Sequence, residues 1–97
     1  PAKAANKERP HRFGIAWWCR RGDAVWLIRR PSSGLLGGMA ALPGPEWTEG
    51  RPSANPLAVA RHGFTHFTLD LFVVPVAEPR GDGWWQDVAR LDEAGLP

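Results

Sequence analysis

The chain lacks the residues and segments that several protein classes need. Its 97 residues include a single cysteine, Cys19, which excludes an internal disulfide and any cluster or zinc site that several thiolates hold. No apolar run approaches the ~20 residues of a membrane-spanning helix, and the first ten residues contain no apolar signal core. We therefore expect a cytoplasmic protein with no membrane association.

The residues that are present predict a small folded domain. Hydrophobic residues make up 43% of the chain and six are tryptophan, which is typical of a globule and not of a disordered segment. A chain of this length buries roughly 60–70% of the surface that its unfolded form exposes, enough for one modest core. Because the chain starts at Pro1 without methionine and stops at Pro97, we expect it to be a piece of a longer protein.

Charge is distributed unevenly along the chain. The net charge is +2, yet residues 1–30 carry eight Lys and Arg against two acids, and residues 31–97 carry four Arg against eight acids. Such asymmetry is typical of a face turned toward a polyanion such as nucleic acid. A solvated, solubilising end explains it equally well, so charge alone leaves both interpretations open.

The first third predicts a linker followed by a hairpin. Residues 1–12 are basic and rich in Pro and Ala without apolar periodicity, as in a linker. Residues 13–19 and 24–30 are apolar and β-prone, and Gly22 and Asp23 between them fit a tight turn. Both runs are apolar on both faces, so we expect the hairpin to lie inside a layered domain.

The remaining segments predict a mixed sheet with one or two short helices. Residues 31–47 are mostly loop with a short apolar segment at 39–42, and residues 48–59 are polar and broken by proline. Residues 84–85 predict a short strand. Helical spacing of apolar residues over 88–94 predicts a last short helix.

The clearest predicted element is a half-buried strand over residues 60–76. Apolar residues at every second position from Phe67 to Val73 alternate with His66, Thr68, Asp70 and Phe72. We expect the strand to end, or to run along a sheet edge, at Pro75, which cannot donate a ladder hydrogen bond.

No catalytic or metal constellation emerges from the residue pattern. His62 and His66 have a zinc-ligand spacing if helical, but in the predicted strand they lie ~13 Å apart along the chain. Cys19 lies in an apolar run and is expected to be inert core, while Glu46 and Glu49 are expected to be solvated loop acids. We therefore predict no catalytic residue and no metal.

A short segment around Gly63 favours nucleic-acid binding. Phe64 offers a flat apolar wedge, Thr65 a hydroxyl that donates and accepts, and His66 a polar ring, while Arg61 adds a phosphate-pairing fork. Such groups side by side are suited to probing a base in a duplex. The alternative is that the aromatic rings are core and Thr65 an ordinary strand residue. The candidate lesion- and DNA-binding residues are Phe64, Thr65, His66, Arg61, His62, Arg29 and Arg30.

Several motifs, in order and at their spacings, resemble one family over essentially the whole chain. They are Pro1–Lys3, Val25–Pro31, Gly34–Met39, Leu42-Pro43, Trp47, Phe64–Phe67, Trp84-Trp85 and Ala94–Pro97. Together they resemble the C-terminal, Nudix-like domain of the A/G-specific adenine DNA glycosylases, the MutY family. Phe64–Phe67 looks like the family's Phe-Ser-His loop, with Thr65 in the position of the serine.

The resemblance implies a fold whose hydrolase chemistry is absent. We expect an α+β, Nudix-like α/β/α sandwich with a mixed sheet and short helices over residues 13–97, after the linker of residues 1–12. The Nudix hydrolase signature places carboxylates on a helix to hold Mg²⁺, whereas this chain offers only Glu46 and Glu49 after Leu42-Pro43. No cofactor is expected in this domain, because the family carries its 4Fe-4S cluster in an N-terminal domain.

The resemblance further implies a role in base-excision repair. In this family the N-terminal domain removes adenine, and the C-terminal domain recognises the 8-oxoguanine opposite, whose N7–H is a donor where guanine N7 accepts. The implied partners are double-stranded DNA containing 8-oxoguanine:adenine and the N-terminal catalytic domain of the same chain, which implies association with the bacterial nucleoid. The alternatives are a divergent Nudix hydrolase of oxidised nucleotides and a protein–protein module.

Overall fold

The structure, a computed structural model, describes residues 9–31 and 37–95. Most of the predicted linker, five residues of the Gly-rich segment (32–36) and the last two residues of the chain lie outside the described ranges. Residue contacts divide the chain into two units. The first comprises Pro1–Ala16 and Gly44–Val74, and the second comprises Trp17–Pro43 and Pro75–Pro97.

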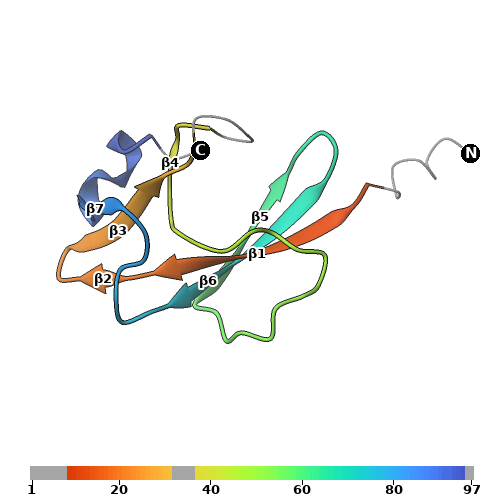
Figure 1. The fold of residues 1–97 in the computed structure, drawn as a ribbon, viewed down its shortest axis with the longest axis horizontal. Helices are drawn as coiled ribbons and strands as arrows, with labels where there is room; N and C mark the ends of the chain where they lie inside the picture. The colour runs from red at the N-terminus through yellow and green to blue at the C-terminus, as the bar shows by residue number, and fades with distance from the viewer. Residues whose placement is uncertain (1–8, 32–36, 96–97) are drawn as a thin grey trace, which may run out of the picture. The chain divides into compact units, whose positions relative to one another are not determined.

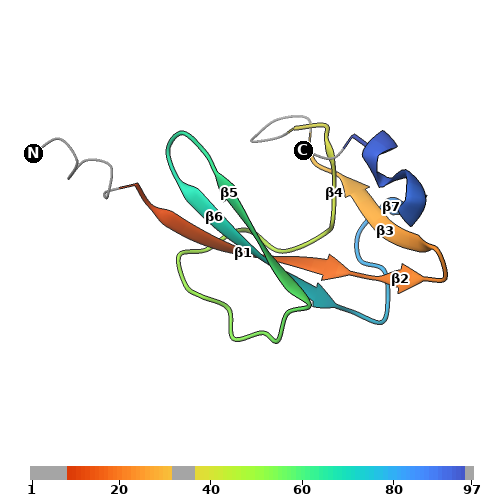
Figure 2. The same ribbon diagram turned by 180° about the vertical axis from the view of Figure 1, so that it is seen from behind.

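The first unit is built on a three-stranded sheet in the order β1-β6-β5 (Figures 1 and 2). Its strands are β1 (His11–Trp18), β5 (Ala58–Gly63) and β6 (Thr68–Pro75), of which the ends Trp17, Trp18 and Pro75 are counted in the second unit. Since β1 begins at His11, the last two residues of the predicted linker belong to a strand. β5 and β6 pair antiparallel, from Ala58 opposite Val73 to Gly63 opposite Thr68.

The prediction of one strand over residues 60–76 is wrong, because the chain reverses within it. Residues Phe64–Phe67 form a four-residue hairpin loop, and the Phe64 N–H donates to the Phe67 carbonyl over 2.8 Å. The alternating pattern from Phe67 onward identified β6. The short and exposed β5, with a burial pattern that shows no alternation, carries no comparable signal.

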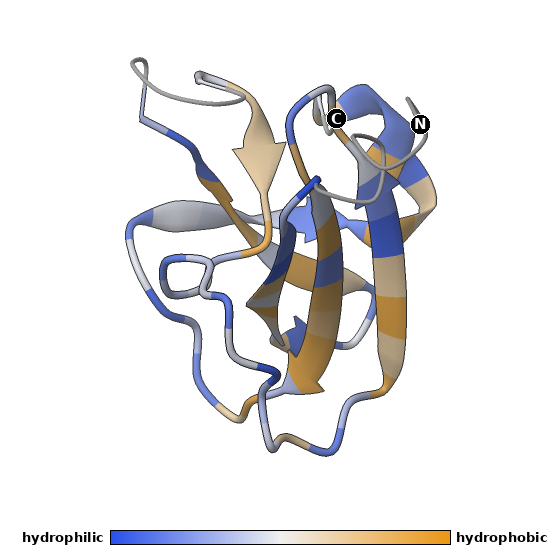
Figure 3. Cartoon of the chain, turned by 90° about the vertical axis from the view of Figure 1, so that its right-hand side faces the viewer, coloured by the Kyte–Doolittle hydropathy of each residue, from blue (hydrophilic) through white to orange (hydrophobic). Residues whose placement is uncertain are grey.

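The expectation that β6 is half-buried is also wrong, because both of its faces are covered. Asp70 and Phe72 are each 3% exposed. The ring of Phe13 meets Phe72 edge-on at 6.4 Å between centroids, and His11 and Arg61 cover Asp70. Hydrophilic and hydrophobic bands alternate along the strands (Figure 3), yet the hydrophilic Asp70 is buried.

Residues 44–48 run beside β1 within the first unit. Phe13 and Thr48 exchange two backbone hydrogen bonds of 2.7 and 2.8 Å. At Gly44 the backbone approaches so closely that a Cβ would collide with the Ile15 carbonyl oxygen, so only glycine fits there. This irregular segment therefore has a defined path along β1. That path determines the position of Trp47, which contacts the loop described below.

The second unit is a four-stranded sheet centred on β3, with one short 3-10 helix. Its elements are β2 (Arg20–Arg21), β3 (Ala24–Arg29), β4 (Ala40–Ala41), β7 (Gly83–Asp87) and η1 (Val88–Glu93). β3 pairs antiparallel with β2, β4 and β7. The strand predicted at residues 84–85 and the last short helix are confirmed, and η1 is capped by the Asp87 side chain.

The hairpin predicted between residues 13–19 and 24–30 is confirmed at its turn, but the two predicted strands do not pair along their length. The turn at Gly22 exists, with φ +57°, but the strand that pairs with β3 is the two-residue β2, beside which the Trp26 N–H donates to the Cys19 carbonyl over 3.0 Å. β1 pairs with β6 instead, and the long partner of β3 is β7. Val25 and Leu27 are thereby buried at 0% and 1% exposure. The core of this unit consists of Val25, Leu27 and Ala40, with Trp18, Leu42, Trp84, Val88, Leu91 and Ala94 packed against it.

Strand predominates over helix throughout the described ranges. Within residues 9–31 and 37–95, η1 is the only helix. No helix in that part of the chain is long and apolar enough to cross a membrane. The two units are therefore a three-stranded sheet that carries a hairpin loop and a four-stranded sheet that ends in η1.

Candidate nucleic-acid interface

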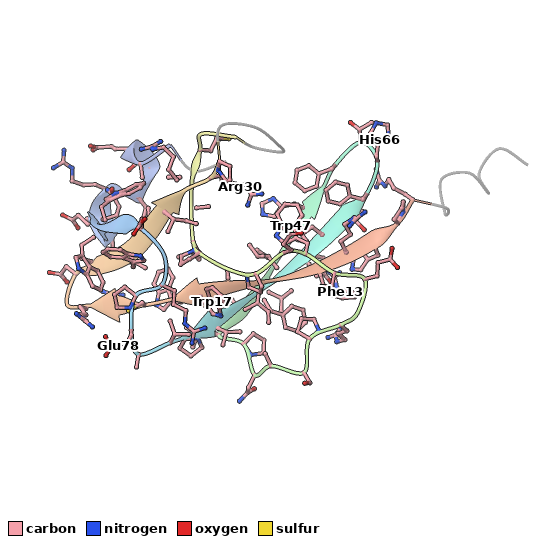
Figure 4. The ribbon with its side chains drawn as sticks, in the orientation of Figure 1. Phe13, Trp17, Arg30, Trp47, His66 and Glu78 are labelled. Atoms are coloured by element: carbon pink, nitrogen blue, oxygen red, sulfur yellow. The ribbon has the colours of Figure 1, made fainter. Side chains whose placement is uncertain are left out.

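The tip of the β5–β6 hairpin presents two polar side chains to solvent. Thr65 and His66 are both exposed, and Figure 4 shows His66 at the end of the hairpin. Because the loop is closed at its base by the Phe64–Phe67 hydrogen bond, its tip is a short, constrained turn. The side chain of Thr65, which carries a hydroxyl, therefore belongs to an exposed residue of a constrained turn.

Three aromatic rings support the loop. Phe64 and Phe67 stack on each other, with centroids 4.6 Å apart and planes at 24°. The Trp47 ring lies 6.3 Å from Phe64 and 6.0 Å from Phe67. We call Trp47, Phe64 and Phe67 the aromatic cluster of the loop. Phe64 and Phe67 are half-buried. The Phe64 ring, predicted to act as an apolar wedge, therefore uses part of its surface for contacts within the hairpin.

Gly14 in β1 allows Trp47 to reach this position. A Cβ on Gly14 would lie 2.6 Å from Trp47 Cδ1 and 2.9 Å from Leu71 Cδ1. The indole therefore lies directly on the strand backbone, and the backbone pairing of Thr48 with Phe13 holds the neighbouring residue in place. Sequence reasoning noted Trp47 only as part of the resemblance. The available signal was a glycine inside an apolar strand, which indicates close approach of another group.

Basic and imidazole groups surround the loop. Arg9 Nη1 donates to the Phe64 carbonyl over 3.1 Å, and the Arg12 guanidinium carbon lies 5.5 Å from the Phe67 ring centroid. The ring of His62, an exposed residue of β5, lies 6.3 Å from that of Phe64 at 34°. The cationic groups at the loop are thus Arg9, which precedes β1, and Arg12 within β1, and the imidazole of His62 comes from β5.

Arg61 is oriented by a buried carboxylate. Its Nε donates to Asp70 Oδ1 over 2.9 Å, and its side chain is 80% exposed while that of Asp70 is 4% exposed. His11 Nε2 lies 3.3 Å from the other carboxylate oxygen, Oδ2. Sequence reasoning identified Arg61 but not its partners, because nothing in a strand pattern marks a buried acid.

The structure brings five of the seven candidate residues together on the hairpin, and the other two belong to the second unit. Arg29 ends β3, where its Nη1 donates to the Gly38 carbonyl over 2.8 Å and its guanidinium carbon lies 5.1 Å from the Trp84 ring. The backbone N–H of Arg30 donates to the Met39 carbonyl. The basic first third of the sequence is therefore divided between two units.

The residues of the alternative sites do not gather into a group in the described part of the chain. Among the described residues, no group of three or more His, Cys, Asp or Glu is placed to hold a metal ion. Cys19 is 1% exposed, with its thiol 3.8 Å from the Ala77 carbonyl oxygen. Glu46 and Glu49 are exposed, and residues 42–57, all described, contain no helix that would gather carboxylates.

Comparison with known proteins places the chain in a family. It belongs to the NUDIX domain family, whose model matches residues 15–97. A similar solved structure is the C-terminal domain of mouse MUTYH, crystallised in complex with human PCNA. The match has a TM-score of 0.50 at 15% sequence identity, and covers 90% of this chain and 79% of that chain. At this identity the likeness is one of fold, and the expected α+β, Nudix-like fold of such a C-terminal domain is confirmed.

Proposed function

We propose that this chain is the lesion-recognition domain of an adenine DNA glycosylase of the MutY type, and that the loop of Phe64–Phe67 contacts 8-oxoguanine opposite adenine. The observation that carries the proposal is the exposed, hydroxyl-bearing Thr65 at the tip of a loop against which aromatic rings stack. A reader of base edges needs such a group in a fixed position, because discrimination depends on hydrogen-bond geometry.

The chemistry of the lesion suits a hydroxyl. In 8-oxoguanine N7 carries a hydrogen and donates, whereas N7 of guanine accepts. A hydroxyl oxygen accepts from that N7–H, and its own hydrogen is available to the new O8 oxygen. Thr65 keeps the hydroxyl of the serine in the family's loop and adds a methyl group that restricts χ1. The half-buried Phe64 offers its exposed part as apolar surface for a neighbouring base.

The proposed partners follow from this role. The domain binds double-stranded DNA containing 8-oxoguanine:adenine, and the N-terminal domain of the same longer chain supplies adenine removal and the 4Fe-4S cluster. This domain itself contributes no catalytic residue and no cofactor. Its contribution is the choice between 8-oxoguanine and guanine opposite the target adenine.

Single-turnover adenine removal by the full-length protein tests the proposal. We expect Thr65→Ala to reduce the preference for 8-oxoguanine:adenine over guanine:adenine by ~1–3 kcal/mol, about 5- to 150-fold, the scale of one good base contact. Thr65→Ser should retain most of the preference. Thr48→Ala is the matched control, because Thr48 is also exposed and its hydroxyl donates within its own turn, to the Gly50 carbonyl. An unchanged preference in Thr65→Ala would contradict the assignment of the loop.

Membership of the NUDIX family favours a second candidate, a divergent hydrolase of oxidised nucleotides. That activity needs carboxylates gathered around Mg²⁺, and the described residues contain no such group. Mg²⁺-dependent release of pyrophosphate from an oxidised nucleoside triphosphate would establish it, and should then survive Thr65→Ala.

A protein–protein module is the third candidate, since the similar mouse domain was crystallised with human PCNA. Binding of lesion duplexes separates this candidate from the proposal. DNA binding through phosphates must weaken as salt rises. Negligible binding at any salt concentration would favour a module whose partner is a protein.

A further inference from the structure

Asp70 lies at the centre of a polar network that the recognition loop does not use. It is the buried charged residue of the described chain, 3% exposed, and each of its carboxylate oxygens has its own partner. Arg61 from β5 approaches one oxygen and His11 from β1 approaches the other. Burying a carboxylate costs free energy unless such partners compensate its charge. The two contacts therefore favour one arrangement of the side chains of His11, Arg61 and Asp70, which come from three different strands.

His11 cannot itself be the group that meets a ligand. Its Nε2 faces Asp70, and its Nδ1 is hydrogen-bonded to the Thr68 hydroxyl. Both ring nitrogens are therefore engaged inside the network. Its role is to fix the carboxylate from the β1 side, which leaves the Asp70 oxygen on the β5 side for Arg61.

Arg61 presents the outward-facing end of this network. Only its Nε contacts Asp70, and its two terminal amino groups make no hydrogen bond with the described residues. The side chain is 80% exposed. A guanidinium held through Nε keeps its terminal fork directed outward, and that fork matches the two oxygens of a phosphate. Holding it in place also removes part of the entropy loss that binding would otherwise cause.

We propose that Arg61 binds a backbone phosphate of the DNA whose base the Phe64–Phe67 loop contacts, and that Asp70 is the positioning residue that orients it. The inference rests on the proposed function for the presence of that DNA. Arg61 precedes Phe64 by three residues of extended chain, about 10 Å at 3.3 Å per residue. A phosphate close to the contacted nucleotide therefore lies within reach of the guanidinium.

Equilibrium binding by the full-length protein at several salt concentrations tests the role of Arg61. Duplexes containing 8-oxoguanine:adenine and guanine:adenine are compared. We expect Arg61→Gln to make the slope of log affinity against log salt shallower by about 0.9, which is about an eightfold loss at 0.1 M relative to 1 M salt. Both duplexes should lose affinity equally. Arg61→Lys, which keeps the charge but not the fork, should recover part of the loss. The control is Arg90→Gln, since Arg90 already pairs with Glu93.

Asp70→Asn distinguishes a role of Asp70 in positioning Arg61 from a mere effect of its negative charge on DNA binding. If Asp70 acted only as a negative charge near DNA, its removal would strengthen binding. If it positions Arg61, Asp70→Asn should weaken binding about two- to tenfold, the fold-change for ordering one long side chain. It should have no further effect in the Arg61→Gln background. Tighter or unchanged binding by a folded Asp70→Asn protein would overturn the positioning role.

The outcomes also separate this inference from the proposed function. If Arg61→Gln leaves the salt slope unchanged while the preference for 8-oxoguanine persists, the phosphate site is refuted and the proposed function stands. If the unmodified full-length protein has no preference for 8-oxoguanine, the proposed function fails regardless of the effect of the Arg61 variants. Should Asp70→Asn fail to fold, the two Arg61 variants still decide whether this side chain binds phosphate.

Discussion

Gly14→Ala is the substitution whose effect the structure specifies most closely. The added Cβ would lie 2.6 Å from Cδ1 and 3.0 Å from Nε1 of Trp47, and 2.9 Å from Leu71 Cδ1. The Leu71 methyl group can rotate away, but the rigid indole has to shift as a whole. Overpacking of this kind lowers the free energy of unfolding by about 1–3 kcal/mol. At 4–8 °C per kcal/mol for a domain of this size, the Tm should fall by roughly 5–20 °C.

Thermal unfolding of matched variants checks this prediction. Gly63→Ala makes the same chemical change on the hairpin, where the added Cβ meets nothing within 4 Å and φ is outside the left-handed region. Its effect should stay within about 0.5 kcal/mol. In a Trp47→Leu background the cost of Gly14→Ala should fall, giving a coupling energy of about 0.5–3 kcal/mol. Equal costs for the two glycines, or no coupling to Trp47, would refute the close packing of the indole on β1.

Two further predictions concern the second unit. Leu27→Ala should lower the free energy of unfolding by about 2–5 kcal/mol in urea denaturation, because Leu27 is 1% exposed inside the core and truncation leaves a cavity; a loss below about 1 kcal/mol would mean that the core is loosely packed. Gly83→Ala should disrupt the pairing of β3 with β7, because its Cβ would collide with the Leu27 carbonyl oxygen. Gly50→Ala is the control, with nothing within 4 Å of its Cβ, and far-UV circular dichroism should distinguish the two.

Local pattern predicted most of the strands but not their partners. Alternation from Phe67 to Val73 located β6, and apolar runs located β1 and β3. The turn sequence at Gly22 led to the prediction that residues 13–19 and 24–30 pair with each other. A good turn sequence predicts a hairpin, but it does not determine how far the two flanking strands continue to pair. β1 pairs with β6 and β3 with β7, more than 50 residues away in sequence. Such pairing depends on which faces bury together, and no short-range period records it.

The candidate site was predicted by residue type more than by geometry. Thr65 and His66 are exposed at the tip of a loop, although the turn that exposes them was predicted as the head of a strand. Trp47 was not predicted as a support because its contacts are with Gly14, Phe64 and Phe67, all far from it in sequence. Arg61 was predicted as a phosphate ligand, and the structure adds the buried carboxylate that orients it.

By itself the sequence determined the chemical composition of this domain: one thiol, no apolar run of membrane-spanning length, β-prone runs, and a short segment that joins aromatic rings, a hydroxyl and an imidazole. Only tertiary structure decided that Asp70 is buried, that Trp47 lies under the loop, and which strands pair. The physical reason is that local conformation follows from neighbouring residues, whereas burial and pairing follow from distant segments that cover a side chain or complete a strand's hydrogen bonds.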